Sequence, residues 1–285
     1  MSETLDRQDA TQLREAVRQR YATAAQLTLA GEPGSCCGPS GCCADTSADP
    51  ITADLYDADA APSETALGAS LGCGNPTVLI DLAPGQDVLD LGSGGGLDVL
   101  LSARRVAPDG TAYGVDMTEE MLRLAERNRA EAGIENARFL RGTIEDLPLP
   151  DDSVDVVISN CVINLSTDKD RVLAEAFRVL RPGGRFAVAD IVLLRDLEPR
   201  LMTVVELWTG CISGALTTED YQAKLRNAGF DNATVQLTRE YTDEDLHDLA
   251  GTVEDALPDS LTVADAVTGL AGAFASAFIR ADKAE

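Results

Sequence analysis

A glycine-rich turn between an apolar strand and a helix is the feature of this sequence that most constrains its fold. Residues 88–98 read VLDLGSGGGLD, so a short apolar run containing Asp90 passes directly into glycines. Apolar residues recur with helical spacing over residues 97–103 and predict a helix there. Glycines at such a corner let a ligand approach the backbone, because no Cβ stands in the way. The stretch therefore predicts a nucleotide-type binding site at the end of a strand.

The spacing of these glycines distinguishes between classes of nucleotide. A dinucleotide fingerprint needs Gly-x-Gly-x-x-Gly, and its third glycine would fall on Leu97. The turn also has no Lys-Ser/Thr pair that would hold a triphosphate. The observed pattern, Asp90 followed by Gly92, Gly94 and Gly96, resembles motif I of the S-adenosylmethionine-dependent methyltransferases. A tight packing corner that binds no ligand is the alternative that the pattern leaves open.

Strand and helix patterns alternate on both sides of this turn. Strands are predicted at residues 88–91, 111–116, 137–141, 154–159, 185–192 and 234–237, with a turn at 181–184. Helices are predicted at residues 3–30, 76–82, 95–106, 118–132, 168–180, 197–208 and 217–228. Parallel strands need crossover helices, so the sequence predicts an α/β fold with a doubly wound, mostly parallel sheet, Rossmann-like as in class I S-adenosylmethionine methyltransferases. Ligands of such sheets bind at the carboxyl ends of the strands.

The charge balance restricts the class of partner. The 285 residues carry 48 acidic and 23 basic side chains, a formal net charge of −25. Such a surface repels a phosphate backbone, which argues against nucleic-acid binding. No apolar run approaches the roughly 20 residues that span a bilayer, and the polar residues 1–20 do not read as a secretory signal. We therefore expect a cytoplasmic protein without a membrane partner.

The acidic excess also predicts a halophilic protein, because salt screens the repulsion between like charges over a few ångströms. An ordinary acidic protein is the alternative. We expect circular dichroism to show that the fold loosens at about 50 mM salt, where screening is weak. A spectrum of the fully folded state at that salt concentration would contradict salt adaptation.

Seven cysteines and a single histidine define the available side-chain chemistry. An odd number of thiols in a cytoplasmic chain indicates thiol chemistry rather than a disulfide framework. Cys36, Cys37, Cys42 and Cys43 form two adjacent pairs in a loop rich in Gly and Pro, and could capture a soft ion or exchange disulfides. Their spacing does not match the usual Cys-x2-Cys of zinc sites, and an inert role is the alternative. His247 lies among acids far from the glycine turn, so a His-based triad is nearly excluded.

Further candidates for donor binding follow the predicted strands. Asp116 ends the second strand, where it can accept hydrogen bonds from ribose hydroxyls, and Met117 can pack on the adenine. Ile144 and Glu145 can contact the face and the amino edge of the adenine, and Asp90 can orient the methionine amino group. A helix N-cap or a solvated loop residue is the alternative for each acid.

Cys73, Cys161 and Cys211 are candidates for holding a methyl acceptor. Cys161 lies just past a core strand, and the other two lie in glycine-rich turns. Oxygen and nitrogen acceptors usually need a general base, and the chain has no plausible histidine for that role. A soft acceptor with a free lone pair needs only to be held in line with the sulfonium methyl. Trivalent arsenic fits, because three thiolates fill its coordination and leave its lone pair available; a small core cysteine is the alternative at Cys161.

Three segments carry a resemblance to a known family. Residues 70–76 (SLGCGNP), 157–165 (VISNCVINL) and 210–216 (GCISGAL) resemble the signature segments of the arsenite S-adenosylmethionine methyltransferases. The resemblance extends from about residue 21 to residue 230. It implies trivalent arsenic bound by Cys73, Cys161 and Cys211, with methyl transfer from S-adenosylmethionine to arsenic.

The resemblance also implies roles for residues outside that trio. A further N-terminal cysteine of the family takes part in thiol exchange, and Cys36 and Cys37 are the candidates for it here. Tyr21-Ala22 stands where relatives have Tyr-Gly, so Tyr21 is a candidate contact of the donor. Asn160, beside Cys161, is a further candidate for donor binding.

The sequence thus predicts an enzyme that methylates arsenite or methylated trivalent arsenicals for arsenic detoxification. A reducing thiol such as glutathione or thioredoxin is the expected co-substrate. A methyltransferase of a small organic acceptor, or a thiol-rich protein that binds soft metals, remains the alternative. Residues 1–70 are predicted as an N-terminal helix and cysteine-bearing loop, 71–195 as the S-adenosylmethionine-binding domain, and 196–285 as a smaller α+β region that helps to bind arsenic.

Overall fold

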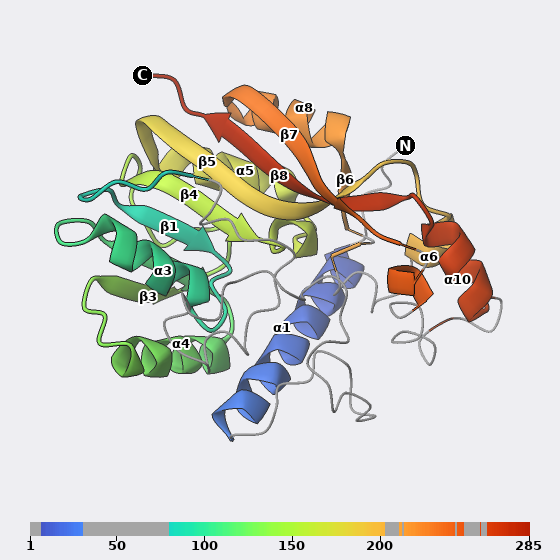
Figure 1. The fold of residues 1–285 in the computed structure, drawn as a ribbon, viewed down its shortest axis with the longest axis horizontal. Coiled ribbons are helices and arrows are strands. Elements are labelled where there is room, and N and C mark those ends of the chain that lie inside the picture. The colour runs from blue at the N-terminus through green and yellow to red at the C-terminus, as the bar shows by residue number, and fades with distance from the viewer. Residues whose placement is uncertain are drawn as a thin grey trace.

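The computed structural model describes residues 7–30, 80–202, 211–212, 214–242, 244–247, 257 and 261–285. Its centre is an eight-stranded sheet in the order β3-β2-β1-β4-β5-β8-β7, with β6 paired to β5 (Figure 1). The strands are β1 Val88–Leu91, β2 Ala112–Asp116, β3 Ala137–Arg141, β4 Val154–Asn160, β5 Leu180–Leu193, β6 Leu216–Thr217, β7 Asp231–Glu240 and β8 Phe274–Asp282.

Helices cover both faces of this sheet. They are α1 Arg7–Leu29, α3 Leu97–Val106, α4 Glu119–Glu131, α5 Lys169–Val179, α6 Pro199–Met202, α8 Thr218–Ala228 and α10 Val263–Leu270, with a 3-10 turn, η2, at Ile163–Leu165. Within the described part of the chain, no helix combines the length and the apolarity needed to cross a membrane.

The prediction of a doubly wound, mostly parallel sheet is confirmed. β1 pairs in parallel with β2 and β4, β2 with β3, and β4 with β5. β8 runs antiparallel between β5 and β7. These two last strands come from the third predicted segment of the chain, yet they extend the same sheet; the three-segment division stays a prediction.

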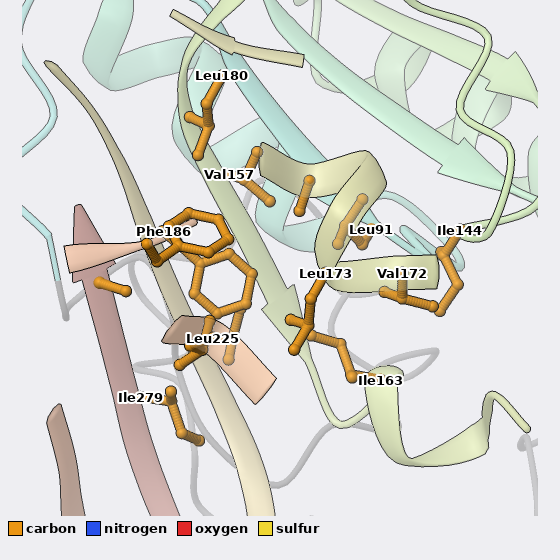
Figure 2. Packing of buried hydrophobic residues seen from close by; sticks show 14 of the residues in the cluster. Leu91, Ile144, Val157, Ile163, Val172, Leu173, Leu180, Phe186, Leu225 and Ile279 are labelled. Atoms are coloured by element: carbon orange, nitrogen blue, oxygen red, sulfur yellow. The ribbon is translucent and has the colours of Figure 1, made fainter. Parts of the chain in front are cut away.

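Alternation along the strands decides which helices cover each face. Leu89 and Leu91 of β1 join a buried cluster with α5 and α8, whereas Val88 belongs to a second cluster on the other face. In that first cluster Leu91 lies with Leu173 of α5 and Leu225 of α8, and Figure 2 labels all three among the packed side chains. Because alternate residues of a strand point to opposite faces, this single strand anchors both helical layers.

Two local expectations are wrong. Residues 181–184 were expected as a turn, but they belong to β5, where the pairing with β4 shifts register between Val154 and Val156. The backbone N–H of Gly183 donates a hydrogen bond to the carbonyl oxygen of Lys283, and the N–H of Lys283 donates one to the carbonyl oxygen of Gly184. These two hydrogen bonds hold the segment in the sheet. Residues 80–82 were expected at the end of a helix and are not helical. Residues 76–79 lie outside the described residues.

The region beyond the sheet core is only partly described. Of the helix expected at 197–208, the structure shows α6, and residues 203–210 lie outside the described part. The helix expected at 217–228 is confirmed as α8, with Thr217 as its N-cap and Gly229 as its C-cap at φ 106°. Residues 270–279, an apolar-rich stretch near the C-terminus, run from the last residue of α10 into β8.

The N-terminal helix α1 packs across the end of the molecule next to α4 (Figure 1). Ala25 of α1 is buried against Met121 and Leu124 of α4. Val17 joins another buried cluster, which also contains Cys161 and Cys211. This helix therefore reaches the carboxyl ends of the strands, where ligands of such sheets bind.

Candidate active site

An open pocket lies at the carboxyl ends of the parallel strands. Its empty volume, which includes open solvent at its mouth, is about 670 Å³. Seven of the residues predicted to bind the donor line it, namely Tyr21, Gly92, Gly94, Asp116, Met117, Ile144 and Glu145. The other lining residues are Arg14, Val17, Gly142, Thr143, Val162, Leu165, Ser166 and Thr167.

The three glycines of the turn are required for two different reasons. All three have positive φ, at 69°, 49° and 86° for Gly92, Gly94 and Gly96. A Cβ at Gly92 would overlap the side chain of Val162, and one at Gly96 would lie 2.6 Å from Phe139 Cζ. A Cβ at Gly94 would meet only Met121 Sδ at 3.9 Å. Gly94 thus keeps pocket space open for a ligand, whereas the other two glycines allow close packing.

Asp116 fixes the glycine turn to the end of β2. Its Oδ2 accepts a hydrogen bond from the backbone N–H of Gly94 at 2.9 Å, and its Oδ1 accepts one from Thr118 at 2.7 Å. Burial raises the pKa of Asp116, and these two hydrogen bonds oppose the rise. The N-cap of α4 is Thr118, so Asp116 is not the helix N-cap that the sequence left open as an alternative; its side chain holds the glycine turn and lies on the pocket wall.

Asp90, Gly96 and Asn160 do not belong to the pocket lining, although the sequence predicted them as donor contacts. Asp90 is buried at the end of β1, and burial, with the nearby charges of Asp98 and Asp116, raises its pKa well above the ordinary value. Asn160 ends β4, and its Nδ2 lies 3.4 Å from Asp98 Oδ2. Asp90, Asp98 and Asp116 therefore lie close together beside the glycine turn, and no sequence pattern marked Asp98 as one of this group.

Glu145 is held by two partners from separate parts of the chain. Ser166 donates its hydroxyl to Glu145 Oε1 at 2.6 Å, and Arg14 of α1 lies 3.6 Å from the same oxygen. Ile144, next to it, is largely buried and lines the pocket. The loop after β3 is therefore fixed to both η2 and α1.

Helix α1 supplies a wall of the pocket that sequence reasoning only partly found. Arg14, Val17 and Tyr21 all line it, and they share one helix face because they are three and four residues apart. The prediction named Tyr21 alone. The spacing 14, 17, 21 is the signal that would have added the other two residues.

Cys161 and Cys211 lie together, although 50 residues separate them in the chain. The Cys211 Sγ is 2.6 Å from the carbonyl oxygen of Cys161. Both residues are buried, and both have positive φ, at 58° and 68°. A left-handed conformation costs a non-glycine residue about 1 kcal/mol, and such strain concentrates at functional sites.

The structure describes only two of the cysteines that the sequence predicts to bind arsenic or exchange thiols. Cys73, Cys36 and Cys37 lie outside the described residues. Cys161 is disulfide-bonded, whereas Cys211 is not part of a disulfide. Across the residues that are described, no group of three or more His, Cys, Asp or Glu side chains is arranged to hold a metal ion.

Buried polar residues that no sequence pattern marked lie near Cys161 and Cys211. The Lys169 ammonium donates to the carbonyl oxygens of Ser166 at 2.7 Å and Asn164 at 3.2 Å, and burial lowers its pKa to about 8. Asp190 on β5 is fully buried, and burial raises its pKa to about 7. The Tyr221 hydroxyl lies 3.4 Å from Asp190 Oδ2. The apolar run within β5 predicts a strand but gives no signal that distinguishes Asp190, its one acid.

Asp190→Asn is expected to become progressively more stable than the native protein as pH rises from 5 to 8. The folded state raises the pKa of this carboxyl from 3.8 to about 7, so it keeps a proton that the unfolded chain releases. The stability contributed by that proton is complete below about pH 4 and is lost as pH rises through 7. Lys169 titrates near 8 and above, mostly outside this window.

The free energy of unfolding, measured by urea denaturation at each pH, should separate the two proteins by about 2 kcal/mol more at pH 8 than at pH 5. Asp109→Asn, at an exposed loop position, is the control for the change itself. A difference that does not vary with pH would contradict the prediction.

Comparison with known proteins places the chain in a family. Residues 82–229 match the family described as "Methyltransferase domain". The chain is 44% identical to the arsenite methyltransferase of Halobacterium salinarum over 246 residues, which cover 82% of this chain and 61% of that protein. It is 36% identical to the human arsenite methyltransferase over 152 residues, 50% of this chain and 40% of that protein. The chain thus spans about three fifths or less of these relatives.

A solved structure gives the same assignment. The chain resembles the arsenic (III) S-adenosylmethionine methyltransferase from Chlamydomonas reinhardtii with a TM-score of 0.60 and 30% identity. That match covers 84% of this chain and 73% of the other. The order of the strands, the pocket at their carboxyl ends and these similarities all indicate the same family. The chain therefore belongs to the methyltransferase-domain family and, within it, to the arsenite S-adenosylmethionine methyltransferases.

Proposed function

We propose that this protein transfers a methyl group from S-adenosylmethionine to trivalent arsenic, as arsenite or a methylated arsenical, held by the thiolates of Cys73, Cys161 and Cys211. The observation that carries the proposal is the meeting of Cys161 and Cys211, with Sγ of one 2.6 Å from the carbonyl oxygen of the other. The names of the relatives in Halobacterium salinarum and Chlamydomonas reinhardtii support the choice of acceptor.

The residues of the pocket fit the methyl donor. Gly94 leaves open the space that a Cβ would fill, and Asp116 offers a buried carboxylate beside it. Asp116 would accept hydrogen bonds from the ribose, while Met117, Ile144 and Glu145 would contact the adenine. Tyr21 would close the pocket from α1. When bound, S-adenosylmethionine supplies an electrophilic methyl group on a sulfonium.

The role of the thiolates is to hold arsenic without consuming its lone pair. Three sulfur ligands satisfy the coordination of As(III) and exclude water from it. The arsenic lone pair forms the As–C bond as the S–C bond of the donor breaks, and the electron pair of that bond stays on the donor sulfur. Holding the two reactants in line accounts for the acceleration, so no general base is needed.

Cys161 must be a free thiol before it can bind arsenic, and in the structure it is disulfide-bonded. Methyl transfer also raises arsenic formally from +3 to +5, and two electrons must return it to +3. A pair of reducing thiols, such as those of glutathione or thioredoxin, would supply them and become a disulfide. Cys36 and Cys37 are the candidates for passing these electrons within the chain. Arsenic detoxification in the cytoplasm remains the predicted setting.

The direct test incubates the purified, reduced protein with arsenite, S-adenosylmethionine and glutathione, and then separates the arsenic species. We expect methylated arsenic in proportion to the S-adenosylhomocysteine formed. Stoichiometric arsenite binding without methylation would point to a soft-metal binding protein. Donor binding without arsenite binding would point to an organic acceptor instead.

A further inference from the structure

The Asn164 side chain joins the two cysteine-bearing segments. It lies in η2, three residues after Cys161, and is completely buried. Its Nδ2 donates to the carbonyl oxygen of Ile191 at 2.7 Å and to that of Cys211 at 3.3 Å. One amide group therefore connects η2, which follows β4, with the C-terminal part of β5 and the segment that carries Cys211.

Burying the Asn164 amide costs free energy, and its apolar neighbours give no packing reason for a polar side chain at this position. Its flanking residues Ile163 and Leu165 are buried and apolar. The Asn164 Oδ1 has no hydrogen-bond partner in the structure as far as its residues are described. A buried polar atom without a partner costs about 1–3 kcal/mol, so a leucine would fill this space more favourably. The site therefore uses the side-chain N–H groups of Asn164 as hydrogen-bond donors, and not the volume of this side chain.

Cys211 is held at two points by the segment that contains Cys161. Asn164 donates to its carbonyl oxygen, and its thiol contacts the carbonyl oxygen of Cys161. Arsenic binding removes the second contact, because a thiolate has no proton to donate and is repelled by a carbonyl oxygen. The hydrogen bond from Asn164 does not depend on that proton and still holds Cys211, with its φ of 68°, beside Cys161.

We infer that Asn164 is a positioning residue of the arsenic site, which holds Cys211 beside Cys161 once its thiol has lost its proton. This inference rests on the proposed function, since it assigns Cys211 as an arsenic ligand. It predicts a defect confined to arsenic: Asn164→Leu should raise the KM for arsenite about tenfold and leave the KM for S-adenosylmethionine unchanged, as expected for one hydrogen bond lost.

The thiol pair can be tested without methyl transfer. In the full chain carrying Cys36→Ser, Cys37→Ser, Cys42→Ser, Cys43→Ser and Cys73→Ser, only Cys161 and Cys211 remain as thiols, and phenylarsine oxide requires two thiolates. After reduction, Asn164→Leu in this background should bind phenylarsine oxide about tenfold more weakly than its parent. Asn136→Leu is the matched control, because Asn136 Nδ2 also joins two carbonyl oxygens, those of Ala103 and Gly110, at 2.8 and 2.9 Å.

The control variant should bind phenylarsine oxide like its parent even if its thermal midpoint falls. Equal affinity in a folded Asn164→Leu protein overturns the inference. If that variant does not fold, Asn164→Ser is measured in the same way, and failure of both to fold while Asn136→Leu folds rejects positioning in favour of a purely structural role. Absence of methylation by the native chain, with the phenylarsine oxide difference intact, rejects only the proposed function.

Discussion

The Cys161→Ser protein is expected to bind S-adenosylmethionine with nearly native affinity and to lose arsenic methylation, retaining less than about 1% of the native rate. A serine hydroxyl is a hard, weak ligand for As(III), so the arsenic would lose one of its three sulfur ligands. The donor pocket should survive, because Cys161 is not among its lining residues and its neighbour Val162 is unchanged.

Two measurements separate the effect on chemistry from an effect on folding. Isothermal titration with S-adenosylmethionine reports the pocket, and separation of arsenic species reports methyl transfer. Cys43→Ser carries the same chemical change outside the proposed ligand set and should keep its activity. Undiminished methylation by Cys161→Ser would remove the thiolate site from the proposal.

Asp116→Asn should weaken S-adenosylmethionine binding by about 10- to 100-fold. The carboxylate accepts from the backbone N–H groups of Gly94 and Thr118 with separate oxygens, and an asparagine has only one acceptor oxygen. One of the two backbone donors would therefore lose its partner, and the ribose hydroxyls would lose a charged acceptor. Each charge-assisted hydrogen bond contributes about 1.5–3 kcal/mol, which sets the range.

Isothermal titration with both S-adenosylmethionine and S-adenosylhomocysteine measures this change. Asp265→Asn is the matched control, since Asp265 also accepts from a backbone N–H, that of Thr262 at 2.9 Å, but does so in the capping box of α10. It should change stability and leave donor affinity as it was. Native affinity in Asp116→Asn would show that the residue only stabilises the start of α4.

The sheet core was predictable because its signals are local. β1 and β3 have the expected bounds, since each is a short apolar-rich run closed by a turn residue. The turn expected at 181–184 was wrong for a non-local reason. The backbone that holds those glycines in β5 belongs to Lys283, about a hundred residues later in the chain.

The candidate site divides in the same way. Gly94 and Asp116 were identifiable because a glycine-rich turn and a strand end indicate ligand-binding positions, and both residues line the pocket. Asn164 and Asp190 were not, since a buried polar residue inside an apolar run has no pattern that distinguishes it from the strand or turn around it. Their roles depend on contacts with Cys211 and Tyr221, which only the folded chain brings near.

Helix α1 forms one wall of the pocket but lies outside the segment that matches the methyltransferase-domain family. Residues 82–229 carry the family match, yet Arg14, Val17 and Tyr21 complete the pocket from a helix outside those bounds. A fragment cut at the limits of this match would retain the glycine motif and Asp116 but would open the pocket on the side that α1 covers. In this chain, therefore, the residues of the matched core alone do not enclose the pocket, because a helix outside the matched segment completes its wall.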